Sequence, residues 1–241
     1  RTLIATTNAP DAVRQPIVNG LLAFESYGSD KILYVTETGA ANGKVNTMLL
    51  DGETTYKIRE HPAGSSYLLG LVRYDGNWIV TTGAAADNRV YVYKNPQAIR
   101  KAGKQEFLVP LRVLKVQSPN YLAFSSNTQL LMVQGGNAFA TYDIENDRSY
   151  DFTTTEPLDA PAQHATWMDG HRIVYVSGGK LVVFDYDNTN RRTIAIMNAG
   201  TLPFFDRDYR NLYVLRTDAG APGAPSKTVL SGTSLLTPAD L

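Results

Sequence analysis

The feature that most constrains the fold of this chain is a segment of about 45 residues that recurs along it. Its clearest copy holds four short apolar runs with Gly, Asp or Asn between them, at residues 163–170, 171–178, 180–187 and 191–197. Runs of this length, rich in β-branched and aromatic residues, predict antiparallel strands. The second run of each copy is marked by Ile32, Ile79, Leu130, Ile173 and Leu212, at intervals of 47, 51, 43 and 39 residues.

Four short strands in every 40–50 residues are typical of β-propellers. A four-stranded sheet with two apolar faces buries both only when it packs between neighbouring sheets. We therefore predict an all-β chain, a β-propeller of four-stranded antiparallel blades, with five blades favoured and six as the alternative. The predicted single domain covers residues 1–241. Its blades span approximately 17–62, 66–116, 118–155, 161–198 and 201–241, and 1–7 is the closing strand.

The longest interval between repeats predicts an insertion at residues 95–105. Asn95 is a candidate N-cap, Pro96 suits the first helical position, and Gly103 suits the helix end. We expect a short helix between the third and fourth strands of the second blade.

Composition excludes several classes of function. Lys plus Arg and Asp plus Glu both number 23, so the basic surplus of a nucleic-acid-binding protein is missing. No cysteine is present, which excludes disulfides, thiolate catalysis and Cys-ligated zinc. The sequence carries no phosphate-binding loop, dinucleotide fingerprint or nucleophile elbow, and we expect no cofactor and no metal.

The segment 167–190 combines a Trp, an Asp-Gly turn, a basic residue, an apolar strand and an Asx-rich turn. It resembles the repeat of TolB-type propellers, a WD-repeat-like family of bacterial envelopes, and it is also similar to the propeller regions that follow PEGA-type domains in bacterial envelope proteins. The matching positions are Trp167, Asp169, Gly170, Arg172, 173–177, Asp185, Asp187, Thr189 and Asn190. Asn188 stands where the family has Gly, and the family's Pro is absent. The resemblance implies an exported, non-catalytic scaffold that binds other proteins.

Two motifs have both a functional and a structural interpretation. The run 185–190 alternates oxygen-bearing side chains as a calcium loop does, but Asn190 and Ile196 stand where an EF-hand has Gly and Glu. An Asx-rich hairpin turn is the favoured interpretation. The histidines, His61, His164 and His171, show no metal-binding spacing, and we expect them at the surface or at blade edges.

An enzyme is the main alternative. Five-bladed glycosidases place carboxylates around the central axis, two of them as acid and base. The candidates here are Glu25, Asp206 and Asp208. Loop-end charges paired with Arg207 or Arg210 are the favoured interpretation, because exposed ion pairs are common.

Candidate binding residues are aromatic and basic side chains near strand ends and in the insertion. Tyr and Trp suit positions with one apolar and one wet side, although ordinary blade packing explains them as well. The candidates are Tyr67, Tyr74, Arg100, Lys101, Lys104, Tyr121, Trp167 and Tyr209. An acidic run in the third blade, with Glu145, Asp147, Asp151, Glu156 and Asp159, is interpreted as a solvated face or a steering patch.

The sequence thus predicts a non-catalytic protein-interaction or sensory scaffold. We expect its partner to be another protein. We expect no nucleic acid, no membrane contact by this domain, and a monomer. The predicted location is the cell surface or envelope, outside the cytoplasmic membrane, with any signal or anchor outside this chain. A purely structural spacer domain is the third interpretation.

Overall fold

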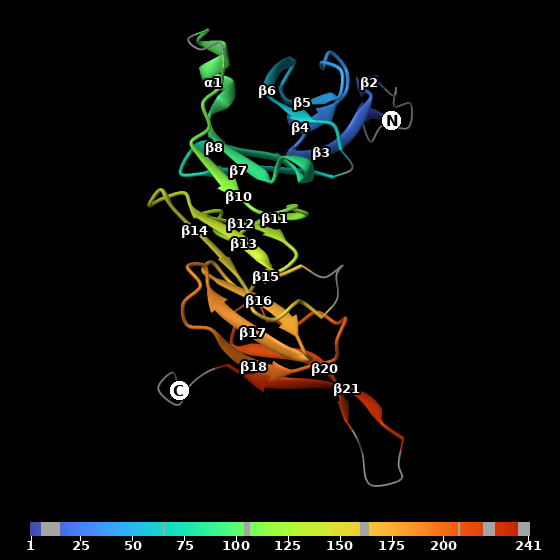
Figure 1. Cartoon of the computed structure of the whole chain (residues 1–241), viewed down its shortest axis with the longest axis vertical. Coiled ribbons are helices and arrows are strands. Elements are labelled where there is room, and N and C mark those ends of the chain that lie inside the picture. The colour runs from blue at the N-terminus through green and yellow to red at the C-terminus, as the bar shows by residue number, and fades with distance from the viewer. Residues whose placement is uncertain are drawn as a thin grey trace. The chain divides into compact units, whose positions relative to one another are not determined.

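A computed structural model of the chain describes residues 1–5, 15–64, 66–103, 107–159, 164–206, 208–218 and 225–235. Its regular structure is almost entirely β, and each sheet is built from strands that are consecutive in sequence. Each sheet therefore occupies one colour interval in Figure 1. The chain divides into two compact units, Arg1–Leu122 and Ala123–Leu241, and each is described by itself.

The first unit contains a two-stranded sheet and two four-stranded antiparallel sheets. The small sheet pairs β1 (Thr2–Ala5) with β2 (Gln15–Asn19). The next sheet has the order β3 (Leu21–Tyr27), β4 (Lys31–Thr36), β5 (Lys44–Asp51), β6 (Thr54–Pro62). The third has the order β10 (Arg112–Lys115), β9 (Arg89–Lys94), β8 (Asn77–Ala84), β7 (Tyr67–Tyr74). A 3-10 turn, η1 (Ala85–Asp87), joins β8 to β9.

The later sheets follow the same meander. One has the order β11 (Tyr121–Phe124), β12 (Leu130–Gly135), β13 (Ala138–Asp143), β14 (Arg148–Thr153). The next has the order β15 (Thr166–Trp167), β16 (Arg172–Ser177), β17 (Lys180–Asp185), β18 (Arg192–Ile196). The last described sheet is three-stranded: β19 (Phe204–Phe205), β20 (Asn211–Asp218), β21 (Lys227–Ser234).

The tight hairpins follow from the turn residues. Asp75 and Gly76 both have positive φ, 45° and 72°, in the two-residue turn between β7 and β8. Gly178 and Gly179, with φ of 56° and 69°, make the same kind of turn between β16 and β17. Two central residues with positive φ give a turn whose twist matches that of the flanking strands.

Apolar faces of successive sheets pack together within each unit. In the first unit, Leu33 and Leu49 of one sheet meet Leu71 and Val80 of the next. In the second unit, residues from β16 and β17 pack against Leu212 and Val214 of β20. The predicted fold class, all-β with four-stranded antiparallel blades of the propeller type, is therefore confirmed.

The domain boundaries stay a prediction. The described strand pairing of the first residues is with a neighbour in sequence, since β1 pairs with β2. The predicted closing of the fifth blade by residues 1–7 is not tested.

The predicted helical insertion is confirmed, and Asn95 takes the N-cap position, but the side-chain cap that was expected of it is not made. Helix α1 (Pro96–Lys101) lies between β9 and β10, with Pro at its start. Asn95 precedes it but its side chain does not cap the helix. Instead its Oδ1 accepts the N–H of Trp78 at 2.7 Å, and its Nδ2 donates to Asn77 Oδ1 at 2.8 Å. Asn95 therefore fixes the chain to the neighbouring hairpin.

Candidate functional site

The structure places the predicted binding residues Tyr67 and Tyr74 at opposite ends of β7. Tyr67 begins β7 and Tyr74 ends it, so about 23 Å separates them along an extended strand. The Tyr67 hydroxyl donates to the carbonyl of Gly64 at 2.9 Å, which fixes the entry to the strand. α1 follows β9 at the Tyr74 end, where Lys94 pairs with Ile79.

The three basic candidates of the insertion differ in their surroundings. The Nε of Arg100 donates to the carbonyl of Lys57 at 3.1 Å, which ties α1 to β6. Lys101 is exposed. Lys104 lies outside the described residues. Their predicted role in binding stays a prediction.

Of the other candidates, Trp167 and Tyr209 make contacts within the fold, and their predicted role in binding stays a prediction. The indole Nε1 of Trp167 donates to the carbonyl of Ala123 at 3.1 Å. Tyr209 adopts φ of 55° and packs against the apolar cluster between the β15–β18 sheet and the β19–β21 sheet. Tyr121 is half-buried on β11, and burial raises the pKa of its phenol.

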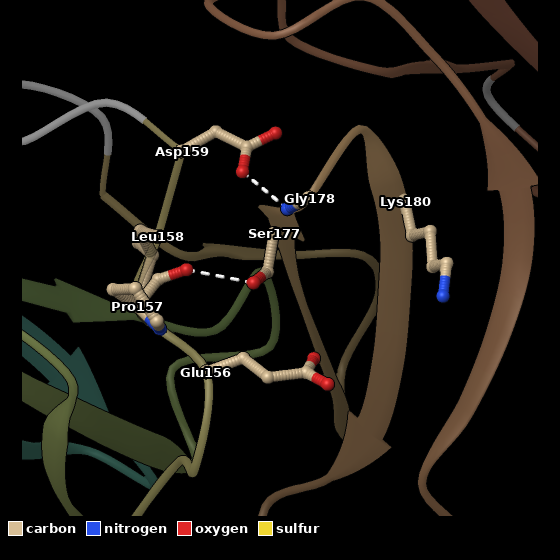
Figure 2. Close-up of a pocket in the computed structure, with 7 residues that line it drawn as sticks. All are labelled: Glu156, Pro157, Leu158, Asp159, Ser177, Gly178 and Lys180. Atoms are coloured by element: carbon tan, nitrogen blue, oxygen red, sulfur yellow. Dashed lines mark hydrogen bonds between the residues drawn. The ribbon is translucent and has the colours of Figure 1, made fainter.

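A pocket of about 480 Å³ lies between the segment after β14 and the β16–β17 hairpin (Figure 2). Sequence reasoning missed it as a site, although Glu156 and Asp159 belong to the acidic run noted above. It is lined by Glu156, Pro157, Leu158, Asp159, Ser177, Gly178 and Lys180.

Asp159 holds the two walls of this pocket together. Its carboxylate accepts the backbone N–H groups of Gly178 and of Gly179, the latter at 2.6 Å. Its own N–H donates to the carbonyl of Val176 at 2.9 Å. The hydroxyl of Ser177 donates to the carbonyl of Pro157 at 2.7 Å (Figure 2). The walls are therefore fixed before any ligand arrives.

Three of the lining residues are charged: Asp159, which forms the clamp, and Glu156 and Lys180, which take no part in it. Both side chains are exposed, and neither makes a hydrogen bond or ion pair with another described residue. Ser177 is buried, and its hydroxyl donates to a carbonyl oxygen, which cannot act as a general base. Fixed walls that carry one anion and one cation, both unpaired among the described residues, suit recognition of a polar ligand.

The Asp159 clamp gives a local prediction. We expect Asp159→Ala to cost about 1.5–3 kcal/mol in the hairpin, because it removes an ionised acceptor from two N–H donors. Hydrogen–deuterium exchange should show the amides of Gly178 and Gly179 exchanging at least about tenfold faster. Asp151→Ala, an exposed carboxylate on β14, is the matched control. Equal exchange in the two variants would contradict the clamp.

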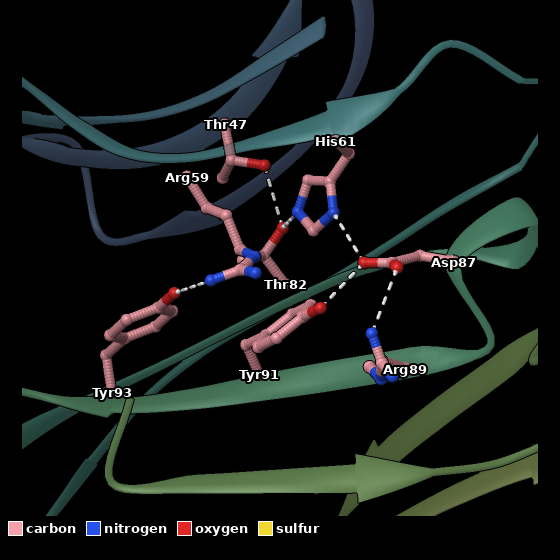
Figure 3. Close-up of polar contacts among 8 residues, drawn as sticks. All are labelled: Thr47, Arg59, His61, Thr82, Asp87, Arg89, Tyr91 and Tyr93. Atoms are coloured by element: carbon pink, nitrogen blue, oxygen red, sulfur yellow. Dashed lines mark hydrogen bonds and ion pairs between the residues drawn. The ribbon is translucent and has the colours of Figure 1, made fainter. Parts of the chain in front are cut away.

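A second polar group is a buried cluster between the β3–β6 sheet and the β7–β10 sheet (Figure 3). The Nε2 of His61 lies 2.9 Å from the hydroxyl of Thr82, which lies 2.7 Å from that of Thr47. The Nδ1 of His61 lies 3.7 Å from a carboxylate oxygen of Asp87. This order of hydroxyl, imidazole and carboxylate resembles a catalytic triad. However, His61, Thr82 and Thr47 are all 0% exposed, so the cluster holds the sheets together.

Aromatic and cationic side chains enclose the cluster. The guanidinium of Arg59 lies 3.3 Å from the ring centroid of Tyr91, and its Nη1 donates to the Tyr93 hydroxyl at 3.1 Å. Burial, reinforced by the charge of Arg59 and opposed by Asp87, lowers the pKa of His61 to about 4. Of the two positions expected for the histidines, His61 takes the blade edge, on the edge strand β6, and it is buried there.

The carboxylates proposed for the enzyme alternative serve local structure where their contacts are described. Asp206 accepts the N–H of Arg210 at 2.7 Å and both the N–H and Nδ2 of Asn211. Hydrogen bonds from Asn211 lower the pKa of Asp206, which disfavours an acid role. Glu25 is on β3, where partial burial raises its pKa, and Asp208 is exposed.

The possible calcium loop folds as an Asx turn. The Oδ1 of Asp187 accepts the N–H of Thr189 at 3.1 Å and its hydroxyl at 2.6 Å. The Nδ2 of Asn190 donates to Asp185 at 2.5 Å. The described residues hold no group of three His, Cys, Asp or Glu side chains placed to bind a metal ion.

In the described part of the chain, no helix is long and apolar enough to cross a membrane.

Comparisons with known proteins give similarity in structure only. No protein-family model and no curated protein matches the chain. A chain of a mitotic checkpoint complex matches with a TM-score of 0.49 and 12% identity, over 85% of this chain and 62% of that one. The WD40 domain of SCAP from fission yeast matches with a TM-score of 0.46 and 8% identity, over 95% and 71%. A functionally unknown protein from Desulfotomaculum acetoxidans matches with a TM-score of 0.46 and 13% identity, over 95% of this chain and 74% of that one.

At these TM-scores the matches add nothing to the fold, which rests on the sheets themselves. The chain spans less than two thirds of the checkpoint-complex chain that it matches.

Proposed function

We propose that this chain is a non-catalytic protein-interaction scaffold that receives a segment of a partner protein in the pocket of Figure 2. The observation that carries the proposal is a pocket with clamped walls and two charges of opposite sign, Glu156 and Lys180, whose side chains have no hydrogen-bond or ion-pair partner among the described residues. A peptide can offer N–H groups or basic side chains to the Glu156 carboxylate, and C=O groups or acidic side chains to the Lys180 ammonium. Prepositioned walls lower the ordering entropy that binding must overcome.

The envelope setting is a second part of the proposal, and it is supported by the TolB-like motif. The scaffold works outside the cytoplasmic membrane as a monomer, with another protein as its partner. The motif residues make the contacts that hold its turn: Asp169 accepts the backbone N–H groups of His171 and Arg172 at 2.8 and 2.7 Å.

Photo-crosslinking tests the pocket directly. Pro157 is exposed, and replacing it with p-benzoylphenylalanine leaves the charges of Glu156 and Lys180 in place. Irradiation in envelope extract of the source organism should give a discrete protein adduct. The same group at Arg148, at the far end of β14, is the control and should give none.

Charge reversal then tests the recognition. Glu156→Lys and Lys180→Glu should each lower adduct yield about tenfold, as expected for loss of a charge contact of about 1.4 kcal/mol. Equal adducts from positions 157 and 148, or yields unchanged by both reversals, would overturn the proposal.

A further inference from the structure

A second pocket, of about 450 Å³, lies at the opposite end of the β16–β17 pair from the pocket of Figure 2. Arg172 pairs with Asp185 at this end, whereas Ser177 pairs with Lys180 at the other, about 17 Å away along the strand. The lining is rich in arginine: Arg172, Val183, Asp185, Asn190, Arg191 and Arg192.

Arg172 is held in place by Asp169. Its Nε and Nη2 both lie 2.6 Å from the same carboxylate oxygen. Hydrogen bonds from the backbone N–H groups of His171 and Arg172 and from the Arg172 side chain lower the pKa of Asp169 against the opposing effect of burial. The ionised carboxylate fixes one edge of the guanidinium, and Nη1 has no partner among the described residues.

The two following arginines differ in their freedom. Arg191 stacks over Phe184, 5.1 Å from its ring centroid, and donates to Tyr175 and Asn188. Arg192 is exposed and makes no hydrogen bond or ion pair with a described residue. Because Arg192 lies opposite Val183 in the β17–β18 register, its backbone is fixed, whereas its guanidinium is unpaired among the described residues.

A smaller cavity of about 80 Å³ adjoins this pocket and shares Arg172, Val183 and Arg192 with it. Its other lining residues are mainly apolar: Met168, Ile194, Tyr209 and Leu235. Two guanidiniums therefore lie beside an apolar recess. This combination fits a negative group that is attached to an apolar one.

We propose that this pocket binds an acidic peptide segment of a partner protein. A Glu or Asp side chain lies between Arg172 and Arg192, and a neighbouring apolar side chain fills the recess beside Tyr209. Asp185 in the same lining repels a dianionic phosphate more than a singly charged carboxylate. The inference extends the proposed function, because it gives the scaffold a second site with a partner of stated chemistry.

Fluorescence anisotropy with a labelled peptide, Gly-Ser-Leu-Glu-Leu-Ser-Gly, tests this inference. We expect saturable binding that Arg192→Ala weakens at least tenfold and that raising the salt from 50 to 300 mM also weakens. Arg216→Ala, which removes an exposed arginine on β20, is the matched control and should change affinity less than twofold. Replacing Glu by Gln in the peptide should weaken binding as much as Arg192→Ala does.

Three outcomes would overturn the inference: no saturable binding, equal binding of the Gln peptide, or equal losses in Arg192→Ala and Arg216→Ala. The proposed function fails separately, because its crosslinks depend on Glu156 and Lys180 at the other end of the sheet. Glu156→Lys should leave binding of the acidic peptide unchanged.

Discussion

Acidification from pH 7.5 to below pH 4 is expected to lower the free energy of unfolding of the first unit by about 3 kcal/mol through His61 alone. The folded pKa of His61 is about 4, against an ordinary value of 6.5. Between these values the unfolded chain binds a proton that the folded chain does not. Stability therefore falls as the pH falls through this window. Above pH 6.5 the contribution of the neutral His61 to the free energy of unfolding is fully present.

The surroundings of His61 explain the direction of the shift. Burial is the largest cause, and Arg59 and Lys44 disfavour a second positive charge, while Asp87 favours it. The Nε2 atom faces Thr82, which is also bonded to Thr47. A proton on His61 would thus place a charge within a site of zero exposure.

The measurement is urea unfolding at pH 7.5, 5.5 and 4, followed by the fluorescence of Trp78. The chain has two tryptophans, Trp78 in the first unit and Trp167 in the second, so a Trp167→Phe background reports the first unit alone. His61→Gln should lower stability at pH 7.5 and flatten the dependence on pH. The same slope in His61→Gln and in the parent would contradict the assignment to His61.

The blades were predictable because their signals are local. Alternating runs and turns such as Asp75-Gly76 set each hairpin within a few residues. The insertion was recognisable from Asn95 and Pro96 for the same reason. The actual role of Asn95 was not, because its partners Asn77 and Trp78 lie 18 and 17 residues away in sequence.

The candidate sites depend on contacts that no local pattern encodes. His61 meets Thr82 across 21 residues, and Asp159 meets Gly179 across 20. His61 lies in β6 and meets β8 of the next sheet, whereas Asp159 follows β14 and meets the β16–β17 turn of the next sheet. Only the packing of the sheets specifies these contacts. A more informative signal was the acidic run, since it already contained Glu156 and Asp159.

Gly83→Ala is expected to destabilise the first unit by about 2 kcal/mol, within the usual range for overpacking a core. Gly83 lies in β8, paired with Leu68 on one side and Val90 on the other. A Cβ atom there would lie 2.7 Å from Cγ2 of Val90 and 2.8 Å from the backbone oxygen of Arg89. The loss of unfolded-state entropy on Gly→Ala offsets only about 0.4–1 kcal/mol.

Urea unfolding monitored by Trp78 again measures the effect, with Gly64→Ala as the control. A Cβ at Gly64 meets only the Cβ of Ala86, at 3.7 Å, so its stability should stay within about 0.5 kcal/mol of the parent. Val90→Ala combined with Gly83→Ala should recover only part of the loss, because the Arg89 carbonyl is backbone and cannot be trimmed. Full recovery of stability in the double variant would show that the Val90 side chain is the only group that excludes a Cβ at Gly83. Unchanged stability in Gly83→Ala would contradict the close approach of β8 and β9.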